Sequence, residues 1–232
     1  MKVFALTGAG VSAESGLGTF RSVDGLWSRF DPMRLATPEG FAADPAAVHE
    51  FYNLRRRNMA AAAPNAAHFA LTELETRLEA RGGELFLCTQ NIDDLHERAG
   101  SRRVWHMHGE IARALCLHCG TRRDWRGDLA VELACPRCGR AGGLRPDVVW
   151  FGEVPYGMEE IEAALEAADR FVAIGTSGSV YPAAGFVARA GDLGIPTMEV
   201  NLEPSDVAGL FGESLYGPAT ETVPALVARL LG

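Results

Sequence analysis

The chain has 232 residues, of which 47% are hydrophobic and 22% are charged, enough for one large core and a small appendage. Its formal net charge of −8 disfavours a protein whose main task is to bind nucleic acid phosphates, because such binding depends on Lys and Arg. The sequence contains neither an apolar stretch of about 18 residues nor the features of a secretion signal at its start. We therefore expect a cytoplasmic protein that does not bind membranes and that is a monomer.

Short apolar segments alternate with helical segments along the chain, which is typical of a parallel sheet covered by helices on both faces. Strands are predicted at residues 3–7, 84–89, 104–106, 148–150, 171–174 and 197–200. Asp44 before Pro45, and Asn65, are N-cap signals that begin two helices, the second of which ends near Arg81. A last helix is predicted at about residues 222–231. The fold class that follows is α/β with a Rossmann-like sheet.

The segment GAGVSAESGLGTFR, residues 8–21, follows the first predicted strand and contains four glycines. The pattern Gly8-x-Gly10-x-x-Ala13 between a strand and a helix is typical of dinucleotide-binding turns, where the helix N-terminus receives a pyrophosphate. A tight turn without a ligand explains the same pattern, so both interpretations stay open. A second Gly/Ser turn, residues 175–179, ends another predicted strand, and two such turns on one sheet favour a ligand.

The adenosine half of a dinucleotide needs an unusual binding site in this chain. A standard dinucleotide-binding domain has its second strand, with an acidic residue for the ribose, within about 30 residues of the glycine turn. Here the next predicted strand is 84–89. Asn201 and Glu203 supply an amide and a carboxylate at the end of the strand 197–200, where ligands of open α/β sheets collect.

Four of the five cysteines form two C-x2-C pairs, Cys116 with Cys119 and Cys135 with Cys138, separated by fifteen residues. This spacing fits a zinc ribbon with four thiolate ligands, and a closed shell of four makes the zinc structural. The alternative of two disulfides is disfavoured because no secretion signal is present. The predicted fold therefore adds a small zinc-ribbon domain to the Rossmann-like sheet with helices on both faces. Cys88, inside an apolar strand, is expected to be a buried core thiol.

Polar residues follow two neighbouring predicted strands. Gln90, Asn91 and Asp93 come after residues 84–89, where their side chains can reach the crevice beside the glycine turn. His106 and His108 point to the same face of an extended segment. The pattern alone does not choose which histidine is a base, and a purely structural role is the simpler interpretation of either one.

These motifs occur together and in a fixed order over residues 3 to about 219. They are GAGVS with Phe20-Arg21, TQNID at 89–93, His108-Gly109, the two C-x2-C pairs, VVWFGE at 148–153, Gly175-Thr176-Ser177 and Asn201-Leu202-Glu203. In this combination the chain resembles the sirtuin family, the NAD-dependent protein lysine deacylases.

The resemblance implies that NAD and zinc are the cofactors and that acylated lysine-containing proteins or peptides are the partners. It implies that His108 is the general base, which lets a ribose hydroxyl attack the imidate formed after nicotinamide leaves. Residues implied to bind NAD are Gly8, Ala9, Gly10, Ser12, Phe20, Arg21, Gln90, Asn91, Asp93, Gly175, Ser177, Asn201, Glu203 and Ala219. Residues implied to pair as a strand with the substrate backbone are Val149, Trp150, Phe151 and Gly152.

The acyl group that is removed is predicted from FYNLRRR, residues 51–57. Tyr52 and Arg55 are three residues apart and share a helix face. From the residues alone, a solvated basic face is the simpler interpretation. The resemblance to the class III branch of sirtuins implies instead that this pair binds the carboxylate of succinyl- and malonyl-lysine, with weaker deacetylation. Arg56 and Arg57 are expected to point elsewhere and to matter little.

The resemblance also implies one deacylase domain over residues 1–232. Its large NAD-binding part is expected at about 1–32, 84–109 and 144–232, and its small part consists of a helical insertion at about 33–83 and the zinc ribbon at about 110–143. Two other functions are weighed against this one: an NAD-dependent dehydrogenase with a structural zinc, and a zinc-ribbon nucleic-acid-binding module. Free nicotinamide that appears only with acyl-peptide distinguishes a deacylase from a dehydrogenase, which reduces NAD.

Overall fold

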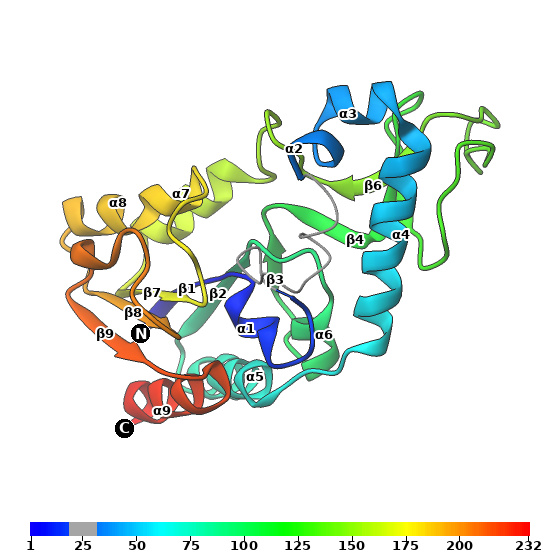
Figure 1. Cartoon of the computed structure of the whole chain (residues 1–232). Coiled ribbons are helices and arrows are strands. Elements are labelled where there is room, and N and C mark those ends of the chain that lie inside the picture. Colours follow the sequence, from blue (N-terminus) through cyan, green and yellow to red (C-terminus); the bar gives the residue numbers. More distant parts are fainter. Residues whose placement is uncertain (19–31) are drawn as a thin grey trace.

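A computed structural model describes residues 1–18 and 32–232, so Phe20 and Arg21 lie outside the described residues. The main element is a six-stranded sheet in the order β3-β2-β1-β7-β8-β9, with every neighbouring pair parallel (Figure 1). Its strands are β1 Lys2–Thr7, β2 Glu84–Thr89, β3 Val104–His106, β7 Arg170–Ile174, β8 Thr197–Asn201 and β9 Glu213–Tyr216. The predicted Rossmann-like parallel sheet is confirmed.

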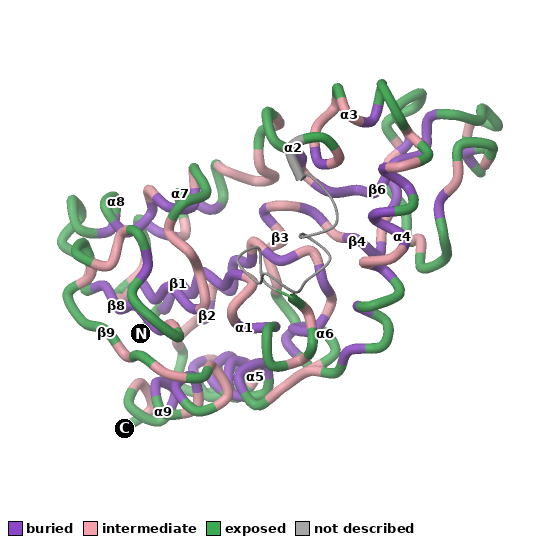
Figure 2. Tube along the Cα trace, in the orientation of Figure 1, coloured by how far each residue is buried: buried purple, intermediate pink, exposed green. Residues whose placement is uncertain are grey.

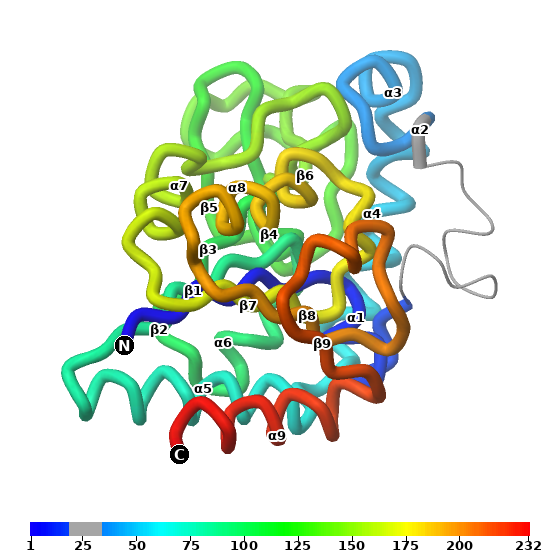
Figure 3. Tube along the Cα trace, turned by 90° about the vertical axis from the view of Figure 1, so that its left-hand side faces the viewer, coloured from blue at the N-terminus to red at the C-terminus, as the bar shows by residue number. Residues whose placement is uncertain are grey.

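Successive residues of the central strands enter two different cores. Val3 and Ala5 of β1 pack with helices α5 (Ala66–Ala80) and α9 (Ala219–Leu231), whereas Phe4 and Leu6 pack with α7 (Met158–Glu166) and α8 (Phe186–Asp192). This follows from the alternation of side chains along a strand, and it explains why β1 is apolar at nearly every position. Figure 2 shows the central strands as buried, and Figure 3 shows α5 and α9 side by side below the sheet.

A second, antiparallel sheet forms the small part of the molecule. Its order is β5-β4-β6, with β4 at Gly109–Cys116, β5 at Arg122–Asp124 and β6 at Leu144–Val148. Helix α4 (Pro45–Ala61) runs along β4 and β6 (Figure 1), and its Phe51 and Tyr52 share a core with Ile111 and Trp150. The short helices α2 (Pro32–Leu35) and α3 (Pro38–Ala43) precede α4.

The remaining elements are short connections. They are the helices α1 Gly10–Ala13 and α6 Leu95–Ala99 and the 3-10 turns η2 Ala183–Gly185 and η3 Ala208–Leu210. Both predicted N-caps are present, since the Asp44 carboxylate accepts from the Ala47 N–H and the Asn65 side chain accepts from the Ala67 N–H. Within the described part of the chain, every helix is too short or too polar to cross a membrane.

One predicted strand is wrong, and one helix packs where its predicted place in the chain did not suggest. The strand predicted at 148–150 is β6, which ends at Val148 and pairs antiparallel with β4 in the small sheet. Helix α5, placed by the sequence in the helical insertion, contributes Leu71, Leu74 and Leu78 to the core beneath the parallel sheet. Helix α5 thus packs against the parallel sheet, because a helix joins the layer in which its apolar face is buried.

Candidate functional site

The carboxyl ends of the parallel strands form the edge at which most predicted site residues gather. From β1 at the centre, β2 and β3 follow in order toward one edge of the sheet. The strands β7, β8 and β9 follow in order toward the other edge. The loops after β1 and β7 therefore diverge from a common point, and ligands of open α/β sheets bind at such a point. The glycine turn at residues 8–10 and the turn at 175–177 both lie there.

These two turns contact each other directly. The Gly10 N–H donates to the Gly175 carbonyl at 2.9 Å, and a Cβ on Gly8 or Gly10 would lie 2.8 or 2.7 Å from atoms of Gly175. Side chains at these two positions would therefore collide with protein before meeting any ligand. The interpretation that these glycines serve only to admit a pyrophosphate is incomplete, because turn-to-turn packing already requires them.

Beneath the glycine turn lies a buried polar network. The Ser12 hydroxyl donates to Asp93 Oδ2 at 3.2 Å and accepts from Asn91 Nδ2 at 3.2 Å, and this amide also donates to the Gly8 carbonyl at 3.2 Å. Burial raises the pKa of Asp93, although hydrogen bonds from the Leu95 N–H and Ser12 act in the opposite direction. Residues predicted from two separate motifs, Ser12 from the glycine turn and Asn91 and Asp93 from residues 89–93, are thus brought together.

Two buried histidines complete this network, and the sequence analysis missed both of them. His68 Nε2 lies 3.4 Å from Ser12 Oγ, and its ring stands 4.9 Å from that of His96. His96 Nε2 lies 3.0 Å from Thr7 Oγ1. A signal for His68 was available, because it occupies the third position of the helix capped by Asn65, where its ring completes a capping box.

His106 and His108 differ in the partners of their ring nitrogens. His108 Nδ1 lies 3.1 Å from the Gln90 carbonyl, which can only accept, so the proton of the neutral ring is on Nδ1 and the lone pair on Nε2. Burial lowers the pKa of His108. A neutral ring at physiological pH with an unprotonated Nε2 is the form that a general base needs.

His106 is engaged at both nitrogens. Its Nδ1 donates to the Asn91 carbonyl, 3.1 Å away, and its Nε2 lies 2.7 Å from Glu97 Oε1. Burial lowers the pKa of His106, but the hydrogen bond and charge of Glu97 outweigh burial and raise it overall. The two histidines therefore differ in that the acceptors found for His106 engage both of its ring nitrogens, whereas the acceptor found for His108 engages Nδ1.

The backbone joins His108 to residues 149–152. The Val149 N–H donates to the His108 carbonyl at 2.9 Å, the Trp150 N–H to Glu153 Oε2 at 2.8 Å, and the Phe151 N–H to the Ala36 carbonyl at 2.9 Å. The backbone N–H groups of residues 149–151 are therefore already engaged. A peptide strand that paired with this segment would have to use its carbonyl groups or replace these hydrogen bonds. Trp150 is 2% exposed, and its side chain packs in the core shared with α4, while the expected pairing of residues 149–152 with substrate concerns their backbone.

Tyr52 and Arg55 lie next to each other on α4, and Tyr52 packs in the core shared with Ile111 and Trp150. The Tyr52 hydroxyl accepts a hydrogen bond of 2.9 Å from Trp150 Nε1, and the Arg55 guanidinium lies 5.7 Å from the centre of the Tyr52 ring. Burial raises the pKa of Tyr52, which keeps its hydroxyl protonated. Burial lowers the pKa of Arg55, whereas the charges of Tyr52 and Asp93 raise it. A phenol and a guanidinium therefore stand together close to the Asp93 network.

Arg56 corrects an expectation from the sequence. Its side chain is 2% exposed, with Nε donating to the Ile111 carbonyl at 2.9 Å and Nη1 to Asn53 Oδ1 at 2.8 Å. Asn53 in turn exchanges two hydrogen bonds of 2.8 Å with the backbone of Leu129. Arg56 is thus a buried link between α4 and the small sheet, whereas Arg57 is exposed and pairs with Asp128.

The residues predicted for the adenosine half follow β7, β8 and β9 along the same edge. The Asn201 amide donates to the Thr176 carbonyl at 2.7 Å, and its oxygen accepts from the Leu202 N–H at 3.0 Å. Ser177 Oγ lies 2.6 Å from Ser179 Oγ. Glu203 is exposed, and Ala219 is the first residue of α9. Asn201 therefore supports the turn after β7 in addition to any contact with a ligand.

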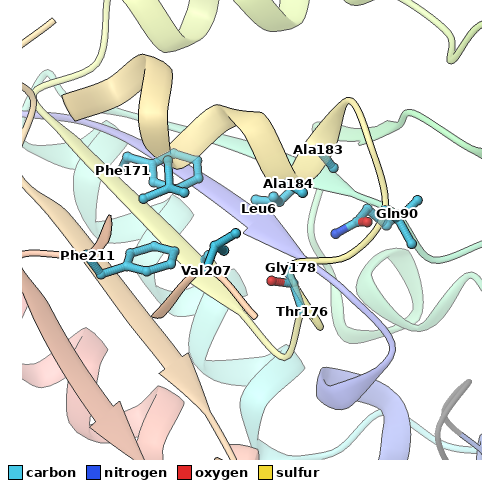
Figure 4. Close-up of a pocket in the computed structure, with 12 residues that line it drawn as sticks. Leu6, Gln90, Phe171, Thr176, Gly178, Ala183, Ala184, Val207 and Phe211 are labelled. Carbon is cyan, nitrogen blue, oxygen red and sulfur yellow. The ribbon is translucent and has the colours of Figure 1, made fainter. Parts of the chain in front are cut away.

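An apolar hollow lies between β7 and α8, below this edge. Figure 4 shows the Gln90 amide at one end and the rings of Phe171 and Phe211 at the other. Most of the residues that line it are apolar, and the Gln90 amide is one of the few polar groups among them.

The four predicted ligand cysteines come together in the small part. Their sulfur atoms all lie within 4.8 Å of one another, and the Sγ pairs Cys116–Cys138 and Cys119–Cys135 are 3.9 Å apart. A disulfide requires about 2.0 Å, whereas sulfurs about 2.3 Å from a tetrahedral zinc are about 3.8 Å apart. The two knuckles share one geometry, because Gly120 and Gly139 follow them with φ of +69° and +72°. The donor set fits zinc and contradicts two disulfides.

The fold and the site define a Rossmann-type nucleotide-binding protein that carries a four-cysteine metal module. The family model for the Sir2 family matches residues 8–182. An NAD-dependent protein deacylase of Caulobacter vibrioides is 64% identical over 231 residues, which cover 100% of this chain and 97% of that protein. One from Escherichia coli strain K12 is 53% identical over 232 residues, 99% of this chain and 82% of that protein.

A solved structure of a Sir2 homologue in complex with NAD has a TM-score of 0.87 and 39% identity, covering 100% of this chain and 91% of that one. The chain belongs to the Sir2, or sirtuin, family of NAD-dependent protein deacylases. The family resemblance and the enzyme class predicted from the sequence are thereby confirmed, and neither the dehydrogenase nor the nucleic-acid-binding module is supported.

Proposed function

We propose that this deacylase acts on acylated lysine side chains, favours succinyl- and malonyl-lysine over acetyl-lysine, and releases nicotinamide and O-acyl-ADP-ribose. The observation that carries the acyl preference is the pair of Tyr52 and Arg55 on one face of α4, near Asp93 and within the buried core shared with Trp150. A cytoplasmic location and a monomeric state remain parts of the proposal, and size-exclusion chromatography with light scattering tests the second.

In this proposal NAD lies along the carboxyl edge of the parallel sheet. Bound there, it supplies the ribose carbon that accepts the acyl oxygen. Its nicotinamide half would be held near Gln90, Asn91 and Asp93, and its adenosine half near Ser177, Asn201 and Glu203, with Ala219 beyond them. The remaining contacts are assigned to Gly8, Ala9, Gly10, Ser12, Gly175, Phe20 and Arg21. His108 Nε2 would take the proton from a ribose hydroxyl, while the Gln90 carbonyl keeps the other ring proton in place.

Zinc is the second proposed cofactor, held by the four cysteines. A shell of four thiolates leaves no position for water or substrate, so the metal would stabilise the small sheet and take no part in the reaction. The cluster shares its core with Ala114, Leu129 and Leu144, and Leu129 also bonds to Asn53 of α4. The zinc module thus supports the helix that carries the proposed acyl-binding pair.

The acyl preference follows from the chemistry of Tyr52 and Arg55. A carboxylate at the end of an acyl chain can accept from the phenol, which stays protonated, and from the guanidinium, which is always charged. An acetyl group lacks that carboxylate. A hydrogen bond to a charged group contributes ~1.5–3 kcal/mol, which corresponds to roughly 10- to 150-fold in kcat/KM in favour of the acidic acyl group.

The test compares succinyl, malonyl and acetyl versions of one peptide by nicotinamide release. Wild-type enzyme is expected to favour the two acidic groups by roughly 10- to 150-fold, and Arg55→Met or Tyr52→Phe to reduce desuccinylation far more than deacetylation. Arg57→Met is the matched control, because this exposed arginine of the same helix pairs with Asp128. Equal kcat/KM for succinyl and acetyl peptides would contradict the proposal. Equal losses of desuccinylation and deacetylation in Arg55→Met would also contradict it. That result would mean that Arg55 interacts with Asp93 rather than with the acyl group.

A further inference from the structure

We propose that Trp150 is a positioning residue for acyl selectivity. Its indole N–H directs the Tyr52 hydroxyl toward the acyl carboxylate, and Arg145 with Glu153 holds the indole in place. This inference rests on the proposed function, because Tyr52 must contact the acidic acyl group for its orientation to matter.

The central contact is the hydrogen bond between the two buried aromatic side chains. Trp150 Nε1 lies 2.9 Å from the Tyr52 hydroxyl, and the residues are 2% and 1% exposed. An indole N–H can only donate, so the phenol oxygen is the acceptor. A phenol has one proton, which lies near the ring plane. With one side of the oxygen occupied by the indole, the proton is left to point to the other side and donate there.

The same hydrogen bond strengthens Tyr52 as a donor. Burial raises the pKa of Tyr52, while Arg55, the Trp150 hydrogen bond and Arg145 all act to lower it. A group that accepts a hydrogen bond is polarised and donates more strongly to the next partner, particularly in a site of low dielectric. The phenol therefore stays protonated, yet its proton is more strongly donated than that of an isolated buried tyrosine.

The indole is held by an ion pair between buried Arg145 and partly exposed Glu153. The Arg145 guanidinium lies 3.3 Å from the centre of the Trp150 ring. Its Nη1 and Nη2 donate to the two carboxylate oxygens of Glu153 at 2.6 and 2.9 Å, and Nη2 also donates to the Val148 carbonyl at 2.6 Å. Glu153 Oε2 accepts from the Trp150 backbone N–H as well. One carboxylate therefore fixes both the backbone of Trp150 and the cation stacked on its ring.

The arrangement forms a sequence of contacts from Glu153 through Arg145 and Trp150 to Tyr52. None of the first three residues needs to touch the acyl group. Removing the indole N–H leaves the phenol in place but frees its hydroxyl to rotate, so the acidic acyl group loses part of its recognition. An acetyl group makes no use of that hydroxyl and is expected to be unaffected.

The experiment measures kcat/KM for succinyl and acetyl peptides with Trp150→Phe, which removes the N–H and keeps an aromatic ring. We expect the ratio of kcat/KM for the succinyl peptide to kcat/KM for the acetyl peptide to fall about 2- to 10-fold, the worth of one hydrogen bond. In a Tyr52→Phe background, Trp150→Phe should have no further effect on desuccinylation, because the hydroxyl it orients is absent. Phe41→Leu is the matched control, since Phe41 packs 5.4 Å from the Trp150 ring without a hydrogen bond and should leave the succinyl-to-acetyl ratio unchanged.

A second variant covers the case in which Trp150→Phe unfolds the protein. Replacement of Trp150 by 3-benzothienylalanine keeps the shape of the indole and substitutes sulfur for the N–H, and it is expected to give the same selective loss. A wild-type enzyme that prefers succinyl peptide, with the ratio unchanged in this variant, would overturn the positioning role alone. Equal losses of kcat/KM on the succinyl and acetyl peptides would also overturn the positioning role. So would effects of the Trp150 variant and of Tyr52→Phe on desuccinylation that are fully additive. A wild-type enzyme without a succinyl preference would overturn the proposed function and this inference together.

Discussion

His108 and His106 are two residues apart, yet their ring partners predict different effects on the reaction. His108→Ala or His108→Tyr is expected to reduce nicotinamide release with acyl-peptide by ~10²–10⁴-fold, the usual contribution of a positioned base. His106→Ala should have a smaller effect, because both of its ring nitrogens are already engaged with Asn91 and Glu97. Calorimetric titration with NAD serves as the control for binding. Equal losses from both variants, with NAD binding intact, would leave the base unassigned.

The pH dependence of the reaction tests the same residue without mutation. Burial lowers the pKa of His108 below its ordinary value of 6.5. The base must be neutral, so kcat/KM for acetyl-peptide should rise with pH along an acid limb whose midpoint lies below 6.5. Deacetylation is the suitable reaction, because an acetyl group carries no titrating carboxylate. An acid limb with its midpoint clearly above 6.5 would contradict this environment for His108.

At the scale of elements, helix α4 is attached to the small sheet through buried hydrogen bonds. Arg56→Met removes the bonds to the Ile111 carbonyl and to Asn53, and should lower the free energy of unfolding by about 2 kcal/mol. Arg57→Met should change it by at most about 0.5 kcal/mol, because its pair with Asp128 is exposed. Urea denaturation measures both. A loss no greater for Arg56→Met than for Arg57→Met would show that the buried bonds of Arg56 do not stabilise the fold.

The zinc ribbon is the element whose folding depends most on a ligand. Cys135→Ala is expected to lose zinc and much of the folded protein together, because metal binding in such a module contributes directly to folding. Cys88→Ala should retain one zinc per chain, since Cys88 lies buried in β2 and outside the four-cysteine cluster. Metal analysis and circular dichroism test both variants. A Cys135→Ala protein that kept its metal and its activity would contradict the assignment.

At the scale of the whole molecule, buried histidines couple stability to pH. Burial lowers the pKa of His68 to about 4 and that of His96 well below 6.5. The unfolded chain binds protons at these residues below about pH 6.5 whereas the folded protein does not, so stability decreases as the pH falls from 6.5 toward 4. At pH 5, His68 alone is expected to account for a loss of roughly 2 kcal/mol in the free energy of unfolding, relative to neutral pH.

Urea denaturation at pH 7.5 and pH 5 checks this expectation. His68→Gln should lose less stability between the two pH values than wild type does. His106→Gln is a control of opposite sign. Its folded pKa is raised, so the stabilisation by His106 is present at low pH and is lost as the pH rises through that pKa. His106→Gln should therefore lose more stability on acidification. An identical loss in wild type and His68→Gln would mean that His68 is not buried in the neutral form.

The sequence by itself determined those features that arise from short-range chemistry. The strands 84–89 and 104–106 have the predicted bounds, because short apolar runs between turn signals are buried in a parallel sheet. Asp44 and Asn65 cap their helices through side chains that reach only two or three residues along the chain. The spacing of the two cysteine pairs was enough to predict the cluster of four cysteines, since each knuckle is local.

Only the tertiary structure decided which distant residues meet. His108 and His106 differ in the partners of their rings. The ring of His108 contacts Gln90, in the segment after β2, and the ring of His106 contacts Glu97, in α6. Helix α5 packs against the large sheet because its leucines are buried in the core beneath that sheet. Trp150 and Tyr52 are 98 positions apart in the chain, and neither residue type nor spacing shows that an indole N–H of one reaches the hydroxyl of the other. The physical reason is that such contacts depend on how helices, strands and loops from distant parts of the chain pack together, and this packing is the sum of many buried contacts rather than a property of any local segment.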